Sequence, residues 1–425
     1  MKSYSTHDIQ IQFPRKLKSA VFAVVLAIQI LASSTSFAMD SADVLPKGIY
    51  SPSIRIGFIS GVGQEYGSDG SLESLGDIHT MSFDAKKLIS IQPQVAQLVS
   101  ALNQFGSQNL GDKISLGYLK LNIQPEINYY APVFARGITD RWTIAIGAPI
   151  IHYRNDVSLE STGSNIDAIH AQVGYSSAQL NGAFNTLKVN LVTQAQQTLA
   201  SLGYQPLGQT NHTYLGDIQI ASLYQFYKDN NFKIMSKTLL GLPTGPEADP
   251  NDLTALDISG QTSLEEQIIL NYRVTAPLTV AAKVFYHYNL ADKVDKRVPL
   301  DSTDTLPAQD QTEKVDRKLG DAAGVGISAT YELFSRFAVS GGLEAQSKAA
   351  DRYSAAQNYD YAALDSGTNS TYQLVKFGLA YSTVKSYFSQ KSFMPFIASF
   401  EYSDIIAGVN MPRVTTNELW LTMFF

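Results

Sequence analysis

Histidine is the first residue type to weigh, because it could act as the general base of a hydrolytic site. Beyond residue 38 the sequence has five histidines, at positions 79, 152, 170, 212 and 287. His152 and His287 each fall near the end of a strand-like segment. A serine hydrolase also needs a nucleophilic hydroxyl and a third group that orients the histidine. No serine-bearing motif of that kind stands near either residue, so the sequence predicts no enzyme.

Metal and cofactor chemistry has equally little support in the sequence. Asp249, Asp252 and Asp257 fall in one short stretch whose carboxylates could bind calcium, but their spacing matches no calcium-loop pattern. The glycines of 61–70 lack the strand and helix context of a phosphate-binding loop. The chain has no cysteine, which excludes disulfides, thiolate metal sites and cysteine nucleophiles. We therefore predict no metal and no cofactor.

The N-terminus has the pattern of an export signal. Basic residues within 15–18 precede the apolar run 20–32, and small residues follow it up to Ala38. The run is shorter than the roughly 20 apolar residues that a bilayer anchor needs. The sequence therefore predicts a cleavable signal peptide over 1–38 and an exported domain over 39–425.

Strand-like segments recur along the exported domain and come in pairs joined by short turns. Asn, Asp, Gly and Pro at the turns supply the backbone geometry that such turns need. With one further strand at each end, the pairs give about twelve strands. The predicted pairs are 127–154, 216–243, 264–290, 322–346 and 371–402, and the end strands are 49–60 and 414–425.

The connections between these pairs are long, so that short turns and long loops alternate without a break. The long loops are 61–113, 154–211, 243–262, 290–320 and 347–370, with a shorter one at 403–413. This alternation is typical of bacterial outer-membrane barrels, which have tight periplasmic turns and long outer loops. The sequence therefore predicts an all-β fold, a transmembrane antiparallel β-barrel of about twelve strands.

Apolar and polar residues alternate within the predicted strands. In 278–289 the even positions from Leu278 to Tyr288 are apolar, whereas Lys283 and His287 stand on the odd face. In lipid the outward face must be apolar and every backbone group must be paired, which strands achieve only in a closed barrel. The polar face is therefore assigned to the lumen. The lumen-lining candidates are Lys233, Lys237, Glu265, Gln267, Asn271, Arg273, Lys283, His287, Glu332, Glu344, Lys376, Glu401 and Glu418.

These candidates carry both signs of charge, which leaves two interpretations open. A twelve-stranded lumen is narrow, and mixed charges across it favour ion pairs that brace the wall. The same residues could instead line a selective path for a solute.

Two of the long outer loops contain helical patterns. Apolar residues stand at helical spacing in 83–106 and again in 165–203. The first interpretation is an amphipathic cap that packs on itself above the barrel, and the second is a lid or plug that controls the passage of an apolar solute.

The C-terminal stretch 414–425 reads as the strand that closes the barrel against 49–60. Leu419, Leu421 and Phe425 share one apolar face that continues to the last residue. A C-terminal aromatic strand also resembles the signal read by the outer-membrane assembly machinery, which makes that machinery a predicted partner.

Three segments carry a resemblance to known families: "ARGITDRWTIAIGAPI" (135–150), "GDIQIASLYQFYKDNNFKI" (216–234) and "LLGLPTG" (239–245). They resemble the outer-membrane transporters allied to the meta-pathway phenol-degradation proteins and, more distantly, the long-chain fatty-acid transporters. The resemblance implies passage of small hydrophobic compounds across the outer membrane. The fatty-acid transporters also carry an N-terminal plug. Here only about ten residues precede the first strand, which argues against such a plug.

The predicted function is therefore an outer-membrane transporter or channel for small hydrophobic solutes, aromatic or fatty-acid-like. The alternatives are a structural or surface-interaction barrel and a lipid-modifying outer-membrane enzyme. Outer-membrane lipids and the solute are the expected partners. The formal net charge of −6 argues against nucleic acid.

Overall fold

The computed structural model describes residues 39–74, 80–104, 109–173, 184, 187, 190–255, 260–302 and 304–425. The predicted signal peptide, 1–38, lies outside these residues. Within the described part no helix is long and apolar enough to cross a membrane.

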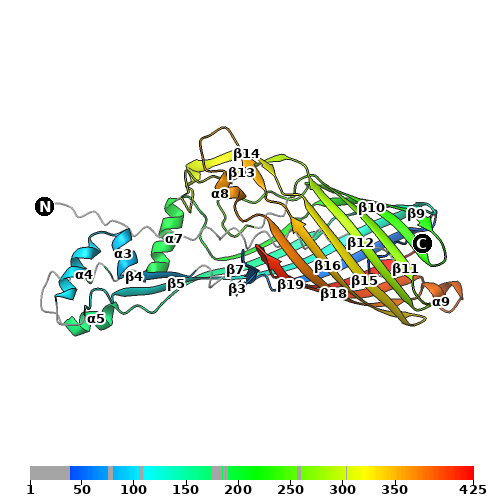
Figure 1. The fold of residues 1–425 in the computed structure, drawn as a ribbon, viewed down its shortest axis with the longest axis horizontal. Coiled ribbons are helices and arrows are strands. Elements are labelled where there is room, and N and C mark those ends of the chain that lie inside the picture. Colours follow the sequence, from blue (N-terminus) through cyan, green and yellow to red (C-terminus); the bar gives the residue numbers. More distant parts are fainter. Residues whose placement is uncertain are drawn as a thin grey trace.

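Twelve antiparallel strands of the described chain form a closed barrel (Figure 1). The first strand, β1, pairs with both β5 and the last strand, β21, so the sheet has no open edge there. This confirms the predicted fold and the predicted closing strand. The barrel strands are β1 (Tyr50–Ser60), β5 (Ser115–Thr139), β6 (Trp142–Gly147), β9 (Ile218–Lys228), β10 (Phe232–Leu242), β11 (Ser263–Arg273), β12 (Leu278–Asn289), β15 (Ala322–Phe334), β16 (Phe337–Lys348), β18 (Ser370–Ser382), β19 (Phe396–Val409) and β21 (Thr415–Met423).

The short turns lie where the sequence predicts them. In the turn between β9 and β10, Asp229 accepts hydrogen bonds from the backbone N–H groups of Asn231 and Phe232. The last turn, between β18 and β19, is longer than the others because it contains a short helix, α9 (Val384–Phe388). Within this turn, Gln390 has a φ of 58°. Figure 1 shows α9 and the C-terminus at the same end of the barrel.

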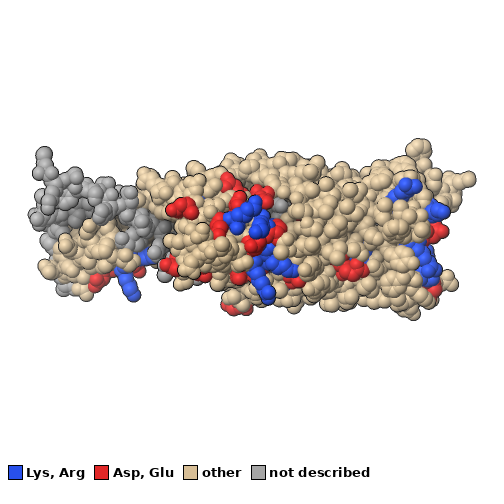
Figure 2. All heavy atoms as spheres, turned by 90° about the horizontal axis from the view of Figure 1, so that it is seen from above, with Lys and Arg blue, Asp and Glu red and all other residues tan. Residues whose placement is uncertain are grey.

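The outward face of the strands is apolar, as predicted. In β12, Val284 and Tyr286 point outward and are about half exposed, whereas Lys283, Phe285 and His287 point inward and are buried. Figure 2 shows charged residues gathered in a central band and at the α9 end, with a largely uncharged surface between them. Such a belt suits the hydrocarbon region of a bilayer.

One hairpin continues beyond the barrel as a ribbon. The first half of β5 pairs with β7 (Ile150–Thr162), and β7 pairs in turn with β8 (Gln209–Leu215). The sequence predicts this hairpin over 127–154 only. In the structure the strands extend from 115 to 162, so the outer loop predicted for 154–211 starts with strand.

The helices of the outer loops pack on each other and on this ribbon. They are α3 (Ala85–Ile91), α4 (Val95–Asn103), α5 (Ile166–Val173) and α7 (Leu191–Ser201), and the short strand β4 (Met81–Asp84) joins them to β5. Asp84 and Asn190 cap α3 and α7 with their side chains. Figure 1 shows α3, α4 and α5 at the end of the ribbon far from the barrel.

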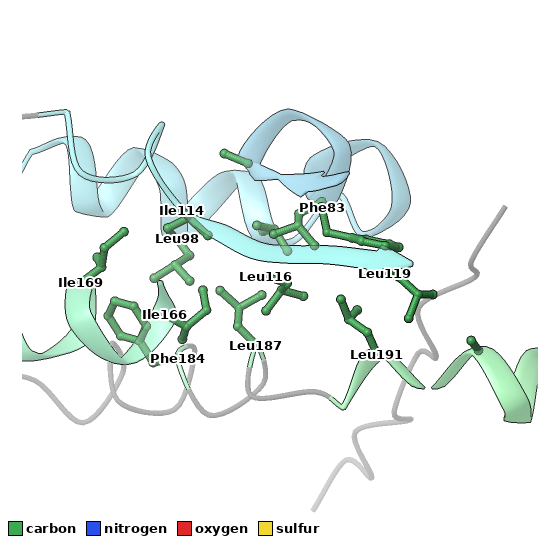
Figure 3. Close-up of a cluster of buried hydrophobic side chains, with 14 of the residues drawn as sticks. Phe83, Leu98, Ile114, Leu116, Leu119, Ile166, Ile169, Phe184, Leu187 and Leu191 are labelled. Carbon is green, nitrogen blue, oxygen red and sulfur yellow. The ribbon is translucent and has the colours of Figure 1, made fainter. Parts of the chain in front are cut away.

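These helices share a hydrophobic core. Leu116 and Leu119 of β5 belong to one buried cluster with Leu98 of α4 and with Leu187 and Leu191, which lie below the strand in Figure 3. Leu180, also predicted for this apolar face, lies outside the described residues. The arrangement agrees with a cap that packs on itself. None of the described helices lies inside the barrel, so they form no plug.

One buried arginine links three of the long connections between the barrel strands. Arg297 donates hydrogen bonds to the carbonyl oxygens of Leu202 at 2.8 Å and Gly203 at 2.6 Å, and to Oδ1 of Asn251 at 2.6 Å. Its guanidinium lies 3.7 Å from the ring centroid of Tyr204. Burial raises the pKa of Tyr204, against the opposing effect of the Arg297 charge. Arg297 comes from β13 (Asp292–Arg297), which pairs with β14 (Thr312–Lys318) above the barrel wall.

Candidate functional site

Residues 39–48 precede β1, and we call them the lumen segment. Residues 39–45 lie inside the barrel, whereas 46–48 are exposed at the end that carries the short turns. The backbone of the lumen segment contacts inward side chains of three different strands. Gln225 donates to the carbonyl oxygen of Ala42 at 2.6 Å, Ser328 donates to that of Met39 at 3.1 Å, and Thr143 accepts from the N–H of Leu45 at 2.8 Å. The expectation that ten residues are too few for a plug is wrong, because a short extended chain suffices to cross a narrow lumen.

Two carboxylates of the lumen segment pair with lysines of the wall. Nζ of Lys283 lies 2.9 Å from Oδ1 of Asp40, and Lys233 forms an ion pair with Asp43. Between them, Asn271 accepts a hydrogen bond from the N–H of Ala42 and donates one to the carbonyl oxygen of Asp40. Three predicted lumen residues thus hold this segment.

The other side of the lumen segment is apolar. Ala42 is buried and Val44 is partly buried against inward residues of β9, β10 and β11. The apolar wall patch consists of Leu223, Met235, Leu239 and Ile269. The lumen segment therefore contacts two lysines of the wall, Lys233 and Lys283, and also an apolar surface of the wall.

Lys283 belongs to a larger ionic cluster. Glu344 accepts from Lys283 and from Lys376, each at 2.8 Å, and from the hydroxyl of Tyr372 at 2.9 Å. The strands β12, β16 and β18, which carry these residues, follow closely around the barrel. The pairs therefore run along the wall, and not across the lumen as predicted. The contacts that do cross it are those of Asp40 and Asp43.

His287 and Glu265 form a second group on the neighbouring strands β11 and β12. Nδ1 of His287 lies 3.2 Å from Oε2 of Glu265, and its Nε2 lies 3.1 Å from Oδ1 of Asn289. Gln267 donates to the other oxygen of Glu265 at 2.5 Å. Lys237 is buried near them and, within the described part of the chain, makes no ion pair. Both ring nitrogens of His287 therefore have polar partners, and the group forms a polar part of the barrel wall.

A third group closes the barrel at the junction of β1, β21 and β5. Arg55 and Glu418 are 1% and 3% exposed and form an ion pair, and the hydroxyl of Tyr129 donates to the same carboxylate. The Arg55 guanidinium also lies 4.1 Å from the ring centroid of Trp420. Glu401, a further predicted lumen residue, stands opposite Glu418 in the register of β19 and β21.

A cavity of about 730 Å³ opens at the end of the barrel that carries the short turns. Of the predicted lumen residues it contains Lys233, Asn271, Arg273 and Glu332, and Lys385 of α9 lies 2.5 Å from Glu332. Val44, Leu45, Phe424 and Phe425 supply apolar lining. The lumen segment forms part of the wall of this cavity.

An apolar section of the lumen lies nearer the ribbon and is not predicted from the sequence. It is a buried cluster contributed by β1, β5, β7, β18 and β19, together with Val62 and Tyr66, which follow β1 in the chain. In this part of the barrel both faces of the strands are apolar. The polarity of a face therefore does not indicate which side chains point inward. Its main members are Ile59, Val62, Tyr66, Ile127, Tyr129, Ile151, Tyr153, Leu374 and Ile405.

The other sites considered from the sequence have ordinary structural roles. Asp249 accepts from Gln205 at 2.9 Å, and Asp252 accepts from the N–H of Thr254 at 2.7 Å. Asp257 lies outside the described residues. Among the described residues no group of three or more histidine, aspartate or glutamate side chains could hold a metal ion.

The closed barrel, its apolar outer belt and its partly apolar lumen define an integral barrel of the outer-membrane type. Among solved structures, the chain is similar to an outer-membrane channel from Pseudomonas putida F1, with 11% identity and a TM-score of 0.50 over 91% of this chain and 98% of that one. It is also matched, more weakly, to the toluene transporter TbuX of Ralstonia pickettii, with 11% identity and a TM-score of 0.32 over 90% of each chain. No family model and no curated protein matches the sequence. The first likeness confirms the expected β-barrel fold.

Proposed function

We propose that the protein is an outer-membrane channel for small hydrophobic solutes. The observation that carries the proposal is the apolar surface that inward side chains supply in three parts of the barrel, beside the ionic groups of the wall. The apolar section near the ribbon, the patch around Met235 and the cavity beside Phe424 follow one another along the barrel. A porin for polar solutes has a polar, water-filled interior instead.

Uptake into proteoliposomes tests this proposal. Vesicles that contain the refolded full chain should take up labelled aromatic or fatty-acid-like compounds faster than protein-free vesicles. A sugar of similar size is the matched control and should show little uptake. A barrel that only presents its helices to a partner would give no uptake of either compound, and a general porin would favour the sugar.

We further propose that the ends of the barrel face opposite sides of the outer membrane, with the short turns in the periplasm and the ribbon outside. The lack of cysteine makes single-cysteine labelling straightforward. Ser164→Cys, beside the end of β7, should react with an impermeant thiol reagent on intact cells, whereas Arg141→Cys in the turn between β5 and β6 should not. Ser164 is preferred to Gly163, whose φ of 84° disfavours a side chain. Reversed labelling would overturn this orientation.

The C-terminal strand supports one further part of the proposal, its recognition by the barrel-assembly machinery. Phe425 exchanges two backbone hydrogen bonds of 2.9 Å with Tyr50 of β1. The last residues of the chain thus complete the seam, and an assembly factor that binds this strand would act on the step that closes the barrel.

A further inference from the structure

We propose that the lumen segment occupies the channel's own solute site, and that the solute displacing it is a hydrophobic carboxylate. This inference rests on the proposed function and names the chemistry of its solute.

The wall around the lumen segment has more positive than negative side chains. Four lysines face this part of the lumen, at positions 233, 237, 283 and 376, and the nearby wall carboxylates are Glu265 and Glu344. Asp40 and Asp43 supply two more carboxylates from the lumen segment. If the segment left, Lys233 would lose its carboxylate partner and Lys283 would share Glu344 with Lys376. Poorly compensated buried charges are costly, so the vacated wall would favour an anion.

The same site also provides apolar contacts. Ala42 and Val44 lie against Leu223, Met235 and Ile269 of the wall patch. The segment thus presents carboxylates and small apolar side chains side by side, which is the chemistry of an aromatic or fatty acid. A neutral hydrocarbon would match only the apolar patch and would leave the lysines unsatisfied.

The remaining contacts of the lumen segment suit displacement. Gln225 and Ser328 donate neutral hydrogen bonds to its backbone, which water could replace at small net cost. Lys47 and Gly48 hold only its end next to β1, through Asp140 and Gly137. Space for movement lies next to the segment, because Asp43, Val44 and Leu45 line the cavity of about 730 Å³.

Binding to the purified full chain separates this inference from its alternatives. Benzoate and benzyl alcohol are matched probes, because they differ mainly in the carboxylate. We expect benzoate to bind at least tenfold more tightly than benzyl alcohol. The double variant Asp40→Asn/Asp43→Asn should raise the benzoate affinity about tenfold, because the competing carboxylates are gone. Lys233→Gln/Lys283→Gln should abolish the preference, and Lys391→Gln, on the exposed α9 turn, should leave it unchanged.

A second measurement does not depend on the folding of those variants. A spin label at Val44→Cys should become more mobile when benzoate is added and stay unchanged with benzyl alcohol. Equal affinity for both probes, or an unchanged label spectrum with benzoate, would overturn the inference. Uptake of neutral aromatics in the vesicle assay would then still support the channel, whereas absent uptake of every hydrophobic compound would refute the proposed function itself.

Discussion

Replacing Glu418 by leucine is expected to lower the free energy of unfolding by about 3–5 kcal/mol, the usual cost of removing one member of a buried ion pair. Arg55 is only 1% exposed, and Glu418 is its carboxylate partner across the seam between β1 and β21. The substitution also removes the acceptor of the Tyr129 hydroxyl. Urea unfolding of the protein in lipid vesicles, followed by tryptophan fluorescence, measures the change.

Two control variants make this expectation specific. The double variant Arg55→Leu/Glu418→Leu should recover much of the lost stability, because neither charge remains buried. Glu401→Gln changes a carboxylate that is partly exposed opposite Glu418 and should cost far less. If Glu418→Leu and Glu401→Gln cost the same, the ion pair does not stabilise the seam.

The second large effect is expected on the lipid-facing side. Val284 lies in the middle of β12 with its side chain outward and 52% exposed. An arginine in its place would put a charge near the middle of the bilayer, and we expect a loss of about 2–4 kcal/mol. The same unfolding measurement applies.

Val280→Arg is the matched control, with the same side chain on the same face of the same strand. Val280 is only two residues from the start of β12, next to the turn at Pro277, and so lies near the interface. There an arginine can extend to water, and the cost should fall to roughly 0–1 kcal/mol. Equal losses at both positions would mean that β12 lies at a different depth from the one inferred here.

The barrel could be predicted because its signals are local. Lys283 and Val284 are neighbours in the sequence, and their opposite chemistry directly indicates which face meets lipid and which meets the lumen. The turns are equally local, since Asp229 bonds to residues two and three positions further on. Strand number and closure therefore followed from short stretches of the chain.

The lumen segment could not be predicted in this way. Lys283 and Asp40 are 243 residues apart, and nothing near Asp40 indicates that it will meet a lysine. The first half of β5 was missed for a different reason. Pro125 argues against a strand interior because it lacks an N–H to donate, but β1 pairs with β5 only from Ile127 onward. The proline therefore lies on a stretch of β5 that β1 leaves uncovered.

The seam between β1 and β21 also determines when this protein can finish folding. Ser53 and Thr422, which share a hydrogen bond across the seam, are 369 residues apart. One edge of β1 must therefore stay without its partner until the final strand has been made and placed. Contacts of such long range form slowly, and an open strand edge invites pairing between chains. Aggregation should threaten the newly exported chain most during this interval, and a chain truncated within its last strand would remain in the aggregation-prone state.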